Sequence, residues 1–173
     1  MHYVVLAYPE ISPSDYKLIQ GIRKVHDRQF AMVEPHFTVV FPTAKVSESE
    51  LLKYAQSLYL DVPPFNFVLT KAIVEENVYP KYYQVHLVAD APIPQITQLH
   101  DLLYTGILES ELRKDIPYVP HVTIASNQDE AVMQKLADEI NIEGLNIPGK
   151  IDTVTISSFG GNQVKAVTKL RLV

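Results

Sequence analysis

The sequence predicts an α+β fold made of two related halves. We expect a bilobal, pseudo-two-fold duplicated fold in which two antiparallel sheets line a central cleft and helices cover the outside. Three observations support this. A Pro-His-x-Thr motif occurs twice, at Pro35–Thr38 and at Pro120–Thr123. Each motif lies between two amphipathic helical patterns. The next predicted strand begins 29 residues after His36 and 26 residues after His121.

Cap and turn residues set the limits of the elements in the first half. Ser12 and Pro13 are a typical N-cap and first-turn pair, and Ser47 with Glu50 forms a capping-box pattern. The predicted elements are a strand at residues 3–8, a helix from Ser12 to about Asp27, a motif strand from His36 to Phe41, a helix from Ser47 to about Leu60, and strands at 65–69 and 82–88 joined by a polar stretch.

The second half repeats this order. A long helical pattern runs from about Pro92 to Leu108, and Gly160-Gly161-Asn162 is a strong hairpin signal. The other predicted elements are a motif strand at 121–126, a helix from about 127 to 140, and strands at 147–158 and 164–172. We expect one domain, residues 1–173, with lobes at roughly 1–90 and 91–173. The sequence leaves open whether the strands at the chain termini are exchanged between the two lobes.

Composition excludes several classes of function. A chain of 173 residues can bury a proper core, and the absence of cysteine excludes disulfides, thiolate metal sites and cysteine nucleophiles. The N-terminal apolar run is too short to span a bilayer, so we expect a cytoplasmic protein without a membrane partner, monomeric by default. The net charge is −5 and no Lys/Arg run exists, which argues against duplex DNA and favours a short RNA end or a nucleotide.

The two motifs are unusual enough to indicate function. Composition alone predicts roughly 0.3 His-x-Thr triplets in this chain and about 0.02 with a preceding proline, yet two are present. Positions i and i+2 of a strand share a face, so His36 projects with Thr38 and His121 with Thr123, while their apolar neighbours enter the core.

Both motif segments resemble those of a known superfamily. The segment His36-Phe37-Thr38-Val39-Val40-Phe41-Pro42 and the segment His121-Val122-Thr123-Ile124-Ala125-Ser126 are similar to the motifs of the two-histidine (2H) phosphoesterases, which include RNA 2′,3′-cyclic phosphodiesterases, also called 2′-5′ RNA ligases. Many members carry a basic residue where this chain has Ser126. The resemblance implies hydrolysis of a 2′,3′-cyclic phosphate as the commonest reaction.

Two histidines suit phosphodiester cleavage without a metal. Imidazole has a pKa of about 6.5, so one ring can act as base and the other as acid near neutral pH. Our working assignment makes His121 the base toward water and His36 the acid toward the departing ribose oxygen, with Thr38 and Thr123 binding the phosphate. The alternative is a non-catalytic module that binds a small nucleotide or an RNA 3′ end on the same scaffold.

Other residues carry weaker signals. Phe41, Tyr83 and Tyr118 are candidates for stacking on a base, and Phe41 fits the core equally well. His86 and His100 are expected to be structural or exposed. Two histidines could ligate zinc, but a catalytic zinc needs a third protein ligand and no His-Glu-x-x-His or similar pairing occurs. No Gly-x-Ser-x-Gly elbow exists either. We therefore expect no metal and no cofactor.

Overall fold

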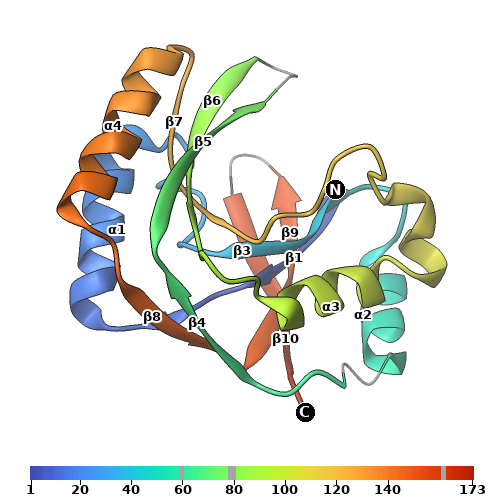
Figure 1. Ribbon diagram of the computed structural model, residues 1–173. Coiled ribbons are helices and arrows are strands. Elements are labelled where there is room, and N and C mark those ends of the chain that lie inside the picture. Colours follow the sequence, from blue (N-terminus) through green and yellow to red (C-terminus); the bar gives the residue numbers. More distant parts are fainter. Residues whose placement is uncertain (59–60, 78–80, 161–162) are drawn as a thin grey trace.

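A seven-stranded and a three-stranded antiparallel sheet form the framework (Figure 1). The computed structural model describes residues 1–58, 61–77, 81–160 and 163–173. Its elements are β1 (His2–Ala7), β2 (Glu10–Ile11), α1 (Pro13–His26), β3 (Phe37–Thr43), α2 (Glu48–Ser57), β4 (Phe65–Leu69), β5 (Lys71–Asn77), β6 (Tyr82–Val88), α3 (Pro94–Leu103), the 3₁₀ helix η1 (Gly106–Glu111), β7 (Val122–Asn127), α4 (Glu130–Glu143), β8 (Ile147–Ile151), β9 (Thr153–Gly160) and β10 (Gln163–Arg171). The α+β class and the two antiparallel sheets are confirmed.

The strand order displays the duplication. The large sheet runs β10-β9-β1-β3-β7-β6-β5 and the small sheet β2-β8-β4. Strands β1, β3 and β5 correspond in chain order to β6, β7 and β9. Counted outward from the boundary between β3 and β7, the first three strands on each side match in this way, and β10 extends one side beyond them. At that boundary Phe37 lies opposite Val122. The approximate two-fold axis therefore passes between the two motif strands.

The relation between sheets and cleft differs from the expectation. Strands β3 and β7 are neighbours in one sheet, so the motif strands do not form opposite walls built from separate sheets. The small sheet supports the back of the large one, where the Phe67 ring of β4 meets the Phe37 ring of β3 edge-on with centroids 5.1 Å apart. Both rings are buried. The small sheet therefore contributes core, and the strand residues that line the cavity described below all belong to the large sheet, joined by residues of the loop before β3.

The helices cover the two flanks of the large sheet. Figure 1 shows α1 and α4 on one flank and α2 and α3 on the other. Helix α1 packs on β7, α3 packs on β3, and α4 packs on β5 and β6. The helix that precedes each motif therefore supports the motif strand of the other half. No helix of the described ranges is long and apolar enough to cross a membrane.

An irregularity follows the threonine in each motif strand. Thr38 pairs with Leu6 and Val40 with Val5, so Val39 is an extra residue in β3. The pairing of β6 with β7 likewise skips Ile124. Such a bulge turns two consecutive side chains to one face. It explains why each threonine is followed by two fully buried apolar residues, Val39-Val40 and Ile124-Ala125.

The predicted helix caps of the first half are present. The Ser12 side chain accepts a hydrogen bond from the Asp15 backbone N–H, and Pro13 opens α1. Ser47 and Glu50 form the complete capping box of α2. These local hydrogen bonds satisfy amide groups that have no partner inside a helix. They fix the helix starts that the sequence predicts.

Four expectations were wrong in detail. The polar stretch after β4 contains an unpredicted strand, β5, which pairs with β6, while β4 joins the small sheet. The predicted strand at 147–158 is divided into β8 and β9, which belong to different sheets. The long helix ends at Leu103, and η1 follows it. The short strand β2 was not predicted. Residues 161–162 of the predicted turn and the predicted helix end at Leu60 lie outside the described residues.

Candidate active site

One cavity of about 290 Å³ collects the side chains of both motifs. His36, Thr38, His121 and Thr123 all line it, together with Phe41. Each of the seven strands of the large sheet contributes at least one lining residue, so the sheet curves around the cavity. The four motif side chains are half-buried, whereas the residues that alternate with them, Phe37 and Val122, are fully buried.

The two histidine rings are held in the same way. Nδ1 of His36 lies 2.7 Å from the carbonyl oxygen of Glu34, and Nδ1 of His121 lies 2.7 Å from the carbonyl oxygen of Val119. A carbonyl can only accept, so Nδ1 carries the proton in both rings. In the neutral rings Nε2 then has the free lone pair. Each ring therefore offers the cavity a nitrogen that can take up or release a proton.

The pairing of the motif strands sets the spacing of these groups. Phe37 lies opposite Val122, and His36 and His121 directly precede β3 and β7. Continuing this antiparallel register by one residue in each direction puts His36 across from Thr123 and Thr38 across from His121. The two histidines are then diagonal neighbours, which an ideal ladder separates by roughly 7–8 Å. A tetrahedral phosphate fits between two rings at such a separation. In this register each histidine faces a threonine of the other half.

Burial favours the neutral form of both rings. It lowers the pKa of His36 to about 4, and the charges of Arg23 and His121 act in the same direction. Burial also lowers the pKa of His121, and the hydrogen bond to Val119 partly opposes this shift. Desolvation penalises the charged imidazolium, which explains the direction. A bound phosphate, being anionic, would raise both pKa values again.

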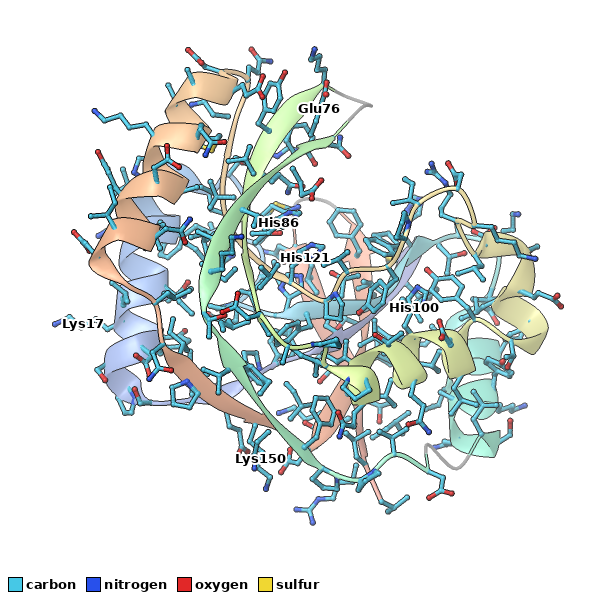
Figure 2. All side chains as sticks on the ribbon, in the orientation of Figure 1. Lys17, Glu76, His86, His100, His121 and Lys150 are labelled. Carbon is cyan, nitrogen blue, oxygen red and sulfur yellow. The ribbon has the colours of Figure 1, made fainter. Side chains whose placement is uncertain are left out.

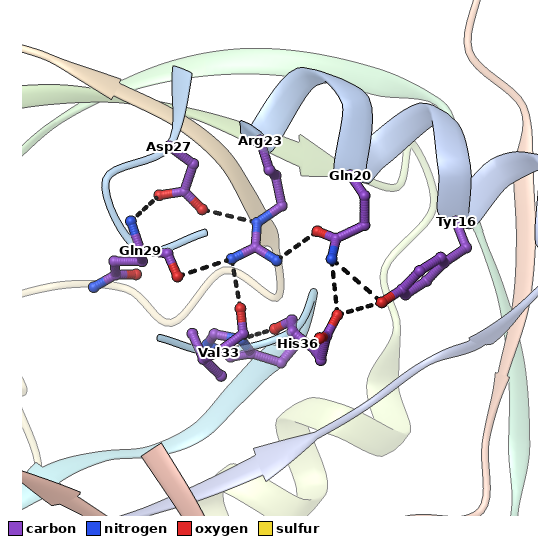
Figure 3. A network of polar contacts seen from close by, with 8 residues as sticks. Tyr16, Gln20, Arg23, Asp27, Gln29, Val33 and His36 are labelled. Carbon is purple, nitrogen blue, oxygen red and sulfur yellow. Dashed lines mark hydrogen bonds and ion pairs between the residues drawn. The ribbon is translucent and has the colours of Figure 1, made fainter. Parts of the chain in front are cut away.

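A buried arginine fixes the loop that leads to the first motif (Figure 3). Arg23 of α1 is fully buried and its Nε lies 2.8 Å from an Asp27 carboxylate oxygen. Its guanidinium also donates to Gln20 Oε1 at 2.9 Å and to the Val33 carbonyl at 2.7 Å. Gln20 continues the network by donating to the Glu34 carboxylate. The carbonyl of Glu34, which holds His36, is therefore attached to α1.

His86 was not expected at the site, yet it lies against His121. The two rings are stacked with centroids 3.7 Å apart and planes 7° from parallel (Figure 2). His86 is buried, and burial followed by the charge of His121 lowers its pKa to about 2. Alternation along β6 would have indicated its place, because Tyr82 and Gln84, on the same face, both line the cavity.

The three predicted stacking residues are placed differently. Phe41 lines the cavity and its side chain is well exposed, 47%. Tyr83 is not among the lining residues, and its ring lies 5.8 Å from the Lys81 ammonium. Tyr118 is also outside the lining and stacks on His100 with centroids 3.8 Å apart. Only Phe41 of the three is therefore positioned to meet a ligand in this cavity.

Arg28 is a cation next to a residue that lines the cavity. None of the described residues that line it is a lysine or arginine. The Arg28 guanidinium lies 4.0 Å from the centre of the Tyr82 ring, and Tyr82 is a lining residue. Ser126 occupies β7 opposite Gln84, and its buried hydroxyl has no hydrogen-bond partner in the described part of the chain. Arg28 is thus a cation that the sequence did not single out.

No metal centre is evident among the described residues. Nowhere in the ranges 1–58, 61–77, 81–160 and 163–173 do three His, Asp or Glu side chains come together as a group that could hold a metal ion. Proton transfer by the two imidazoles is the chemistry that the cavity residues themselves can supply.

A duplicated antiparallel α+β fold with paired histidines in one cavity defines the two-histidine class of phosphoesterases. Residues 9–163 match the sequence model of the 2′-5′ RNA ligase superfamily, and the chain belongs to this family. A Bacillus licheniformis protein predicted to be a phosphoesterase is 28% identical over 142 residues, 80% of this chain and 74% of that protein. A similarly named protein of Oceanobacillus iheyensis is 24% identical over 155 residues, 88% of this chain and 86% of its own.

Solved structures share the fold. The crystal structure of E. coli LigT in apo form matches with a TM-score of 0.62 and 18% identity, covering 99% of this chain and 96% of that one. LigT complexed with 3′-AMP matches with a TM-score of 0.61 and 16% identity, covering 99% and 97%. The Thermus thermophilus protein TT0787 has a TM-score of 0.60 at 16% identity, covering 99% and 98%. These likenesses extend over the whole fold.

Proposed function

We propose that this protein is a metal-independent phosphodiesterase that opens 2′,3′-cyclic phosphates, or cleaves 2′-5′ linkages, in small nucleotides or at RNA 3′ ends. The observation that carries the proposal is the convergence of both motifs in one cavity, with each histidine keeping Nε2 for substrate. Binding alone would not require two titratable rings. An acid and a base together do, because a proton must leave the nucleophile and another must reach the leaving oxygen.

In the proposed reaction a water oxygen attacks phosphorus between the two rings. One neutral imidazole takes a proton from this water through Nε2. The bond from phosphorus to one ribose oxygen breaks, and the other ring, protonated, gives a proton to that oxygen. The product is a phosphomonoester. Thr38 and Thr123 donate hydrogen bonds to the phosphoryl oxygens, which orients the phosphate and stabilises the charge that develops on it.

The size and charge of the site support a small substrate. A cavity of about 290 Å³ lies at the lower end of ligand pockets, roughly 300–1,000 Å³. It can take a phosphate with its ribose, while a base would extend toward exposed Phe41. LigT, which shares the fold, has been crystallised with 3′-AMP, ATP and NADP⁺. A nucleotide or a single RNA end is therefore the substrate class we propose.

The test is a turnover assay on the four 2′,3′-cyclic nucleotides and on a 2′-5′ dinucleotide, with EDTA present throughout. Activity is expected to survive chelation. It should fall by at least about 10²-fold in His36→Ala and in His121→Ala, since each removes one general catalyst. His26→Ala, which changes a histidine outside the cavity lining, is the control and should keep wild-type turnover.

Two results would count against the proposal. One is wild-type turnover in either motif variant. The other is a folded wild-type protein that binds nucleotide tightly but turns over none of these substrates, which would identify a binding module on the same scaffold.

A further inference from the structure

The two halves differ at one buried position beside the motif threonines. In the β6–β7 pair His86 lies opposite Thr123, and in the β1–β3 pair Leu6 lies opposite Thr38. His86 and Leu6 are therefore equivalent under the approximate two-fold axis. Both are buried. An aliphatic side chain fills this position in one half, whereas an imidazole fills it in the other.

The histidine is not explained by hydrogen bonding. Nε2 of His86 is buried and has no hydrogen-bond partner among the described residues. A buried polar atom without a partner is unfavourable, so packing alone would favour leucine here as well. The contact that distinguishes His86 is its stacking on His121, at 3.7 Å between centroids and 7° between planes. What His86 provides at this position is therefore the flat face of its ring, which stacks on His121.

We propose that His86 is a positioning residue: its uncharged imidazole holds the His121 ring in place and favours the protonated form of that ring, which makes His121 the general acid. This rests on the proposed function above. A cation is attracted to the face of a neutral aromatic ring, and Leu6 offers no such face to the other half. The aromatic neighbour of His36 is Tyr8, whose ring is not stacked on it but lies at 63° with centroids 6.1 Å apart. His36, which lacks a stacked imidazole, is then the base that deprotonates water. This reverses our working assignment from the sequence.

The surroundings of His86 decide whether His86 or His121 takes up a proton. The residues directly opposite it are Ile73 of β5 and Thr123 of β7, and neither is ionisable at neutral pH. Among the described residues, His121 is the titratable group whose charge acts on His86, and burial is the larger cause of the low pKa of His86. A proton shared by this pair therefore goes to His121.

The first experiment does not depend on turnover. The ring protons of His36 and His121 are titrated by NMR in wild type, His86→Leu and His86→Phe. In His86→Leu the His121 midpoint should move to lower pH by about half a unit, because the face that stabilises the cation is lost. His86→Phe keeps a flat ring and should restore the midpoint. The midpoint of His36, which His86 does not contact, should move less than that of His121.

The second experiment measures kcat, KM and the pH profile on a 2′,3′-cyclic nucleotide. His86→Leu should lower kcat about three- to tenfold and leave KM within about twofold of wild type. The high-pH limb of the pH–rate profile, which reports loss of the proton from the general acid His121, should move to lower pH. His86→Phe should restore most of kcat. Leu87→Val changes the next residue of β6, on the opposite face, and should leave the His121 midpoint and the pH profile unchanged.

An unchanged or raised His121 midpoint in His86→Leu would overturn the proposal, as would a His86→Phe variant as impaired as His86→Leu. The same shift in Leu87→Val would attribute the effect to general packing and overturn it too. If wild type turns over no cyclic nucleotide, the proposed function fails, and the NMR titration still decides whether His86 supports protonated His121.

Discussion

The hydroxyl of Tyr118 donates a 2.8 Å hydrogen bond to the backbone carbonyl of Thr38. Tyr118 belongs to the loop before the second motif, whereas Thr38 belongs to the first motif strand. The bond therefore links the loop that leads to His121 to strand β3, which carries Thr38. Its geometry is rigid, because the tyrosine ring also stacks on buried His100.

Tyr118→Phe tests this link. The variant keeps the ring and its stacking but leaves the Thr38 carbonyl without this donor, so the free energy of unfolding should fall by about 1 kcal/mol. The value of kcat should fall by less than about tenfold, because the hydroxyl positions Thr38 without lining the cavity. Urea unfolding and turnover provide the two measurements. Tyr83→Phe, on β6 and outside the cavity lining, is the control; equal stability of wild type and Tyr118→Phe would contradict the link.

The threonine hydroxyls can be tested without changing side-chain shape. Thr38→Val and Thr123→Val remove a hydroxyl while keeping the β-branched form, and each should lower kcat/KM about 10- to 100-fold, as expected for a lost hydrogen bond to a charged group. Thr38→Ser and Thr123→Ser keep the donor and should stay within a few-fold of wild type. Inhibition by inorganic phosphate measures binding directly. Valine variants with wild-type phosphate affinity would exclude the proposed role.

The sequence was sufficient to predict the motif strands and the caps because these depend on local rules. Alternation placed His36 with Thr38 on one face, and the capping serines satisfy amides within a few residues of themselves. Strand β5 was missed since it is an edge strand whose outer positions are charged, as edges often are. The break between β8 and β9 depends on which sheet each segment joins, and no local signal encodes that.

The candidate site likewise combines features that local sequence rules predict with features that depend on long-range strand pairing. The composition of each motif identified the four side chains, but the register of β3 against β7 brings them together, and this is a contact between residues 85 positions apart. The stacking of His86 on His121 likewise depends on the pairing of β6 with β7. Alternation puts His86 on the same face of β6 as Tyr82 and Gln84, but the sequence did not show that this face turns toward the cavity. The residues that surround the four motif side chains are therefore determined by long-range strand pairing, which the composition of the sequence does not predict.

Arg23 is expected to be important for stability. Replacing it with alanine leaves the Asp27 carboxylate buried without its partner and frees the loop whose Glu34 carbonyl holds His36. Breaking a buried ion pair in this way should lower the free energy of unfolding by about 3–5 kcal/mol. Lys24→Ala, at the neighbouring exposed position, should change it by less than about 0.5 kcal/mol. Denaturant unfolding of both variants is the measurement, and similar losses in both would contradict the role of the network.

Stability should depend on the charge states of His36 and His86. The pKa of His36 is lowered to about 4 and that of His86 to about 2, chiefly by burial, against about 6.5 in the unfolded chain. Below pH 6.5 the unfolded state therefore binds more protons, and stability falls as the pH falls from 6.5 toward 4. Above 6.5 neither ring contributes to the slope.

The contribution of one ring can be isolated by substitution. His86→Phe removes one of these titrations, so between pH 6 and 5 its free energy of unfolding should fall less steeply than that of wild type, by about 1 kcal/mol per pH unit. Leu87→Val should keep the wild-type slope. Parallel pH dependence of wild type and His86→Phe in urea unfolding would mean that His86 is not held in its neutral form by the fold.

Arg28 is an exposed cation placed to attract an anionic substrate. Its guanidinium lies 4.0 Å from the centre of the Tyr82 ring at the edge of the cavity, and the described lining residues include no lysine or arginine. Arg28→Gln should therefore raise KM for a cyclic nucleotide about three- to tenfold at low salt, with little change in kcat. The difference should shrink at 0.5 M salt, where exposed charges are screened within about 4–5 Å. Arg113→Gln removes another exposed arginine, one paired with Asp115, and should leave KM unchanged. If KM rises equally in both variants, the effect comes from net charge and not from the position of Arg28.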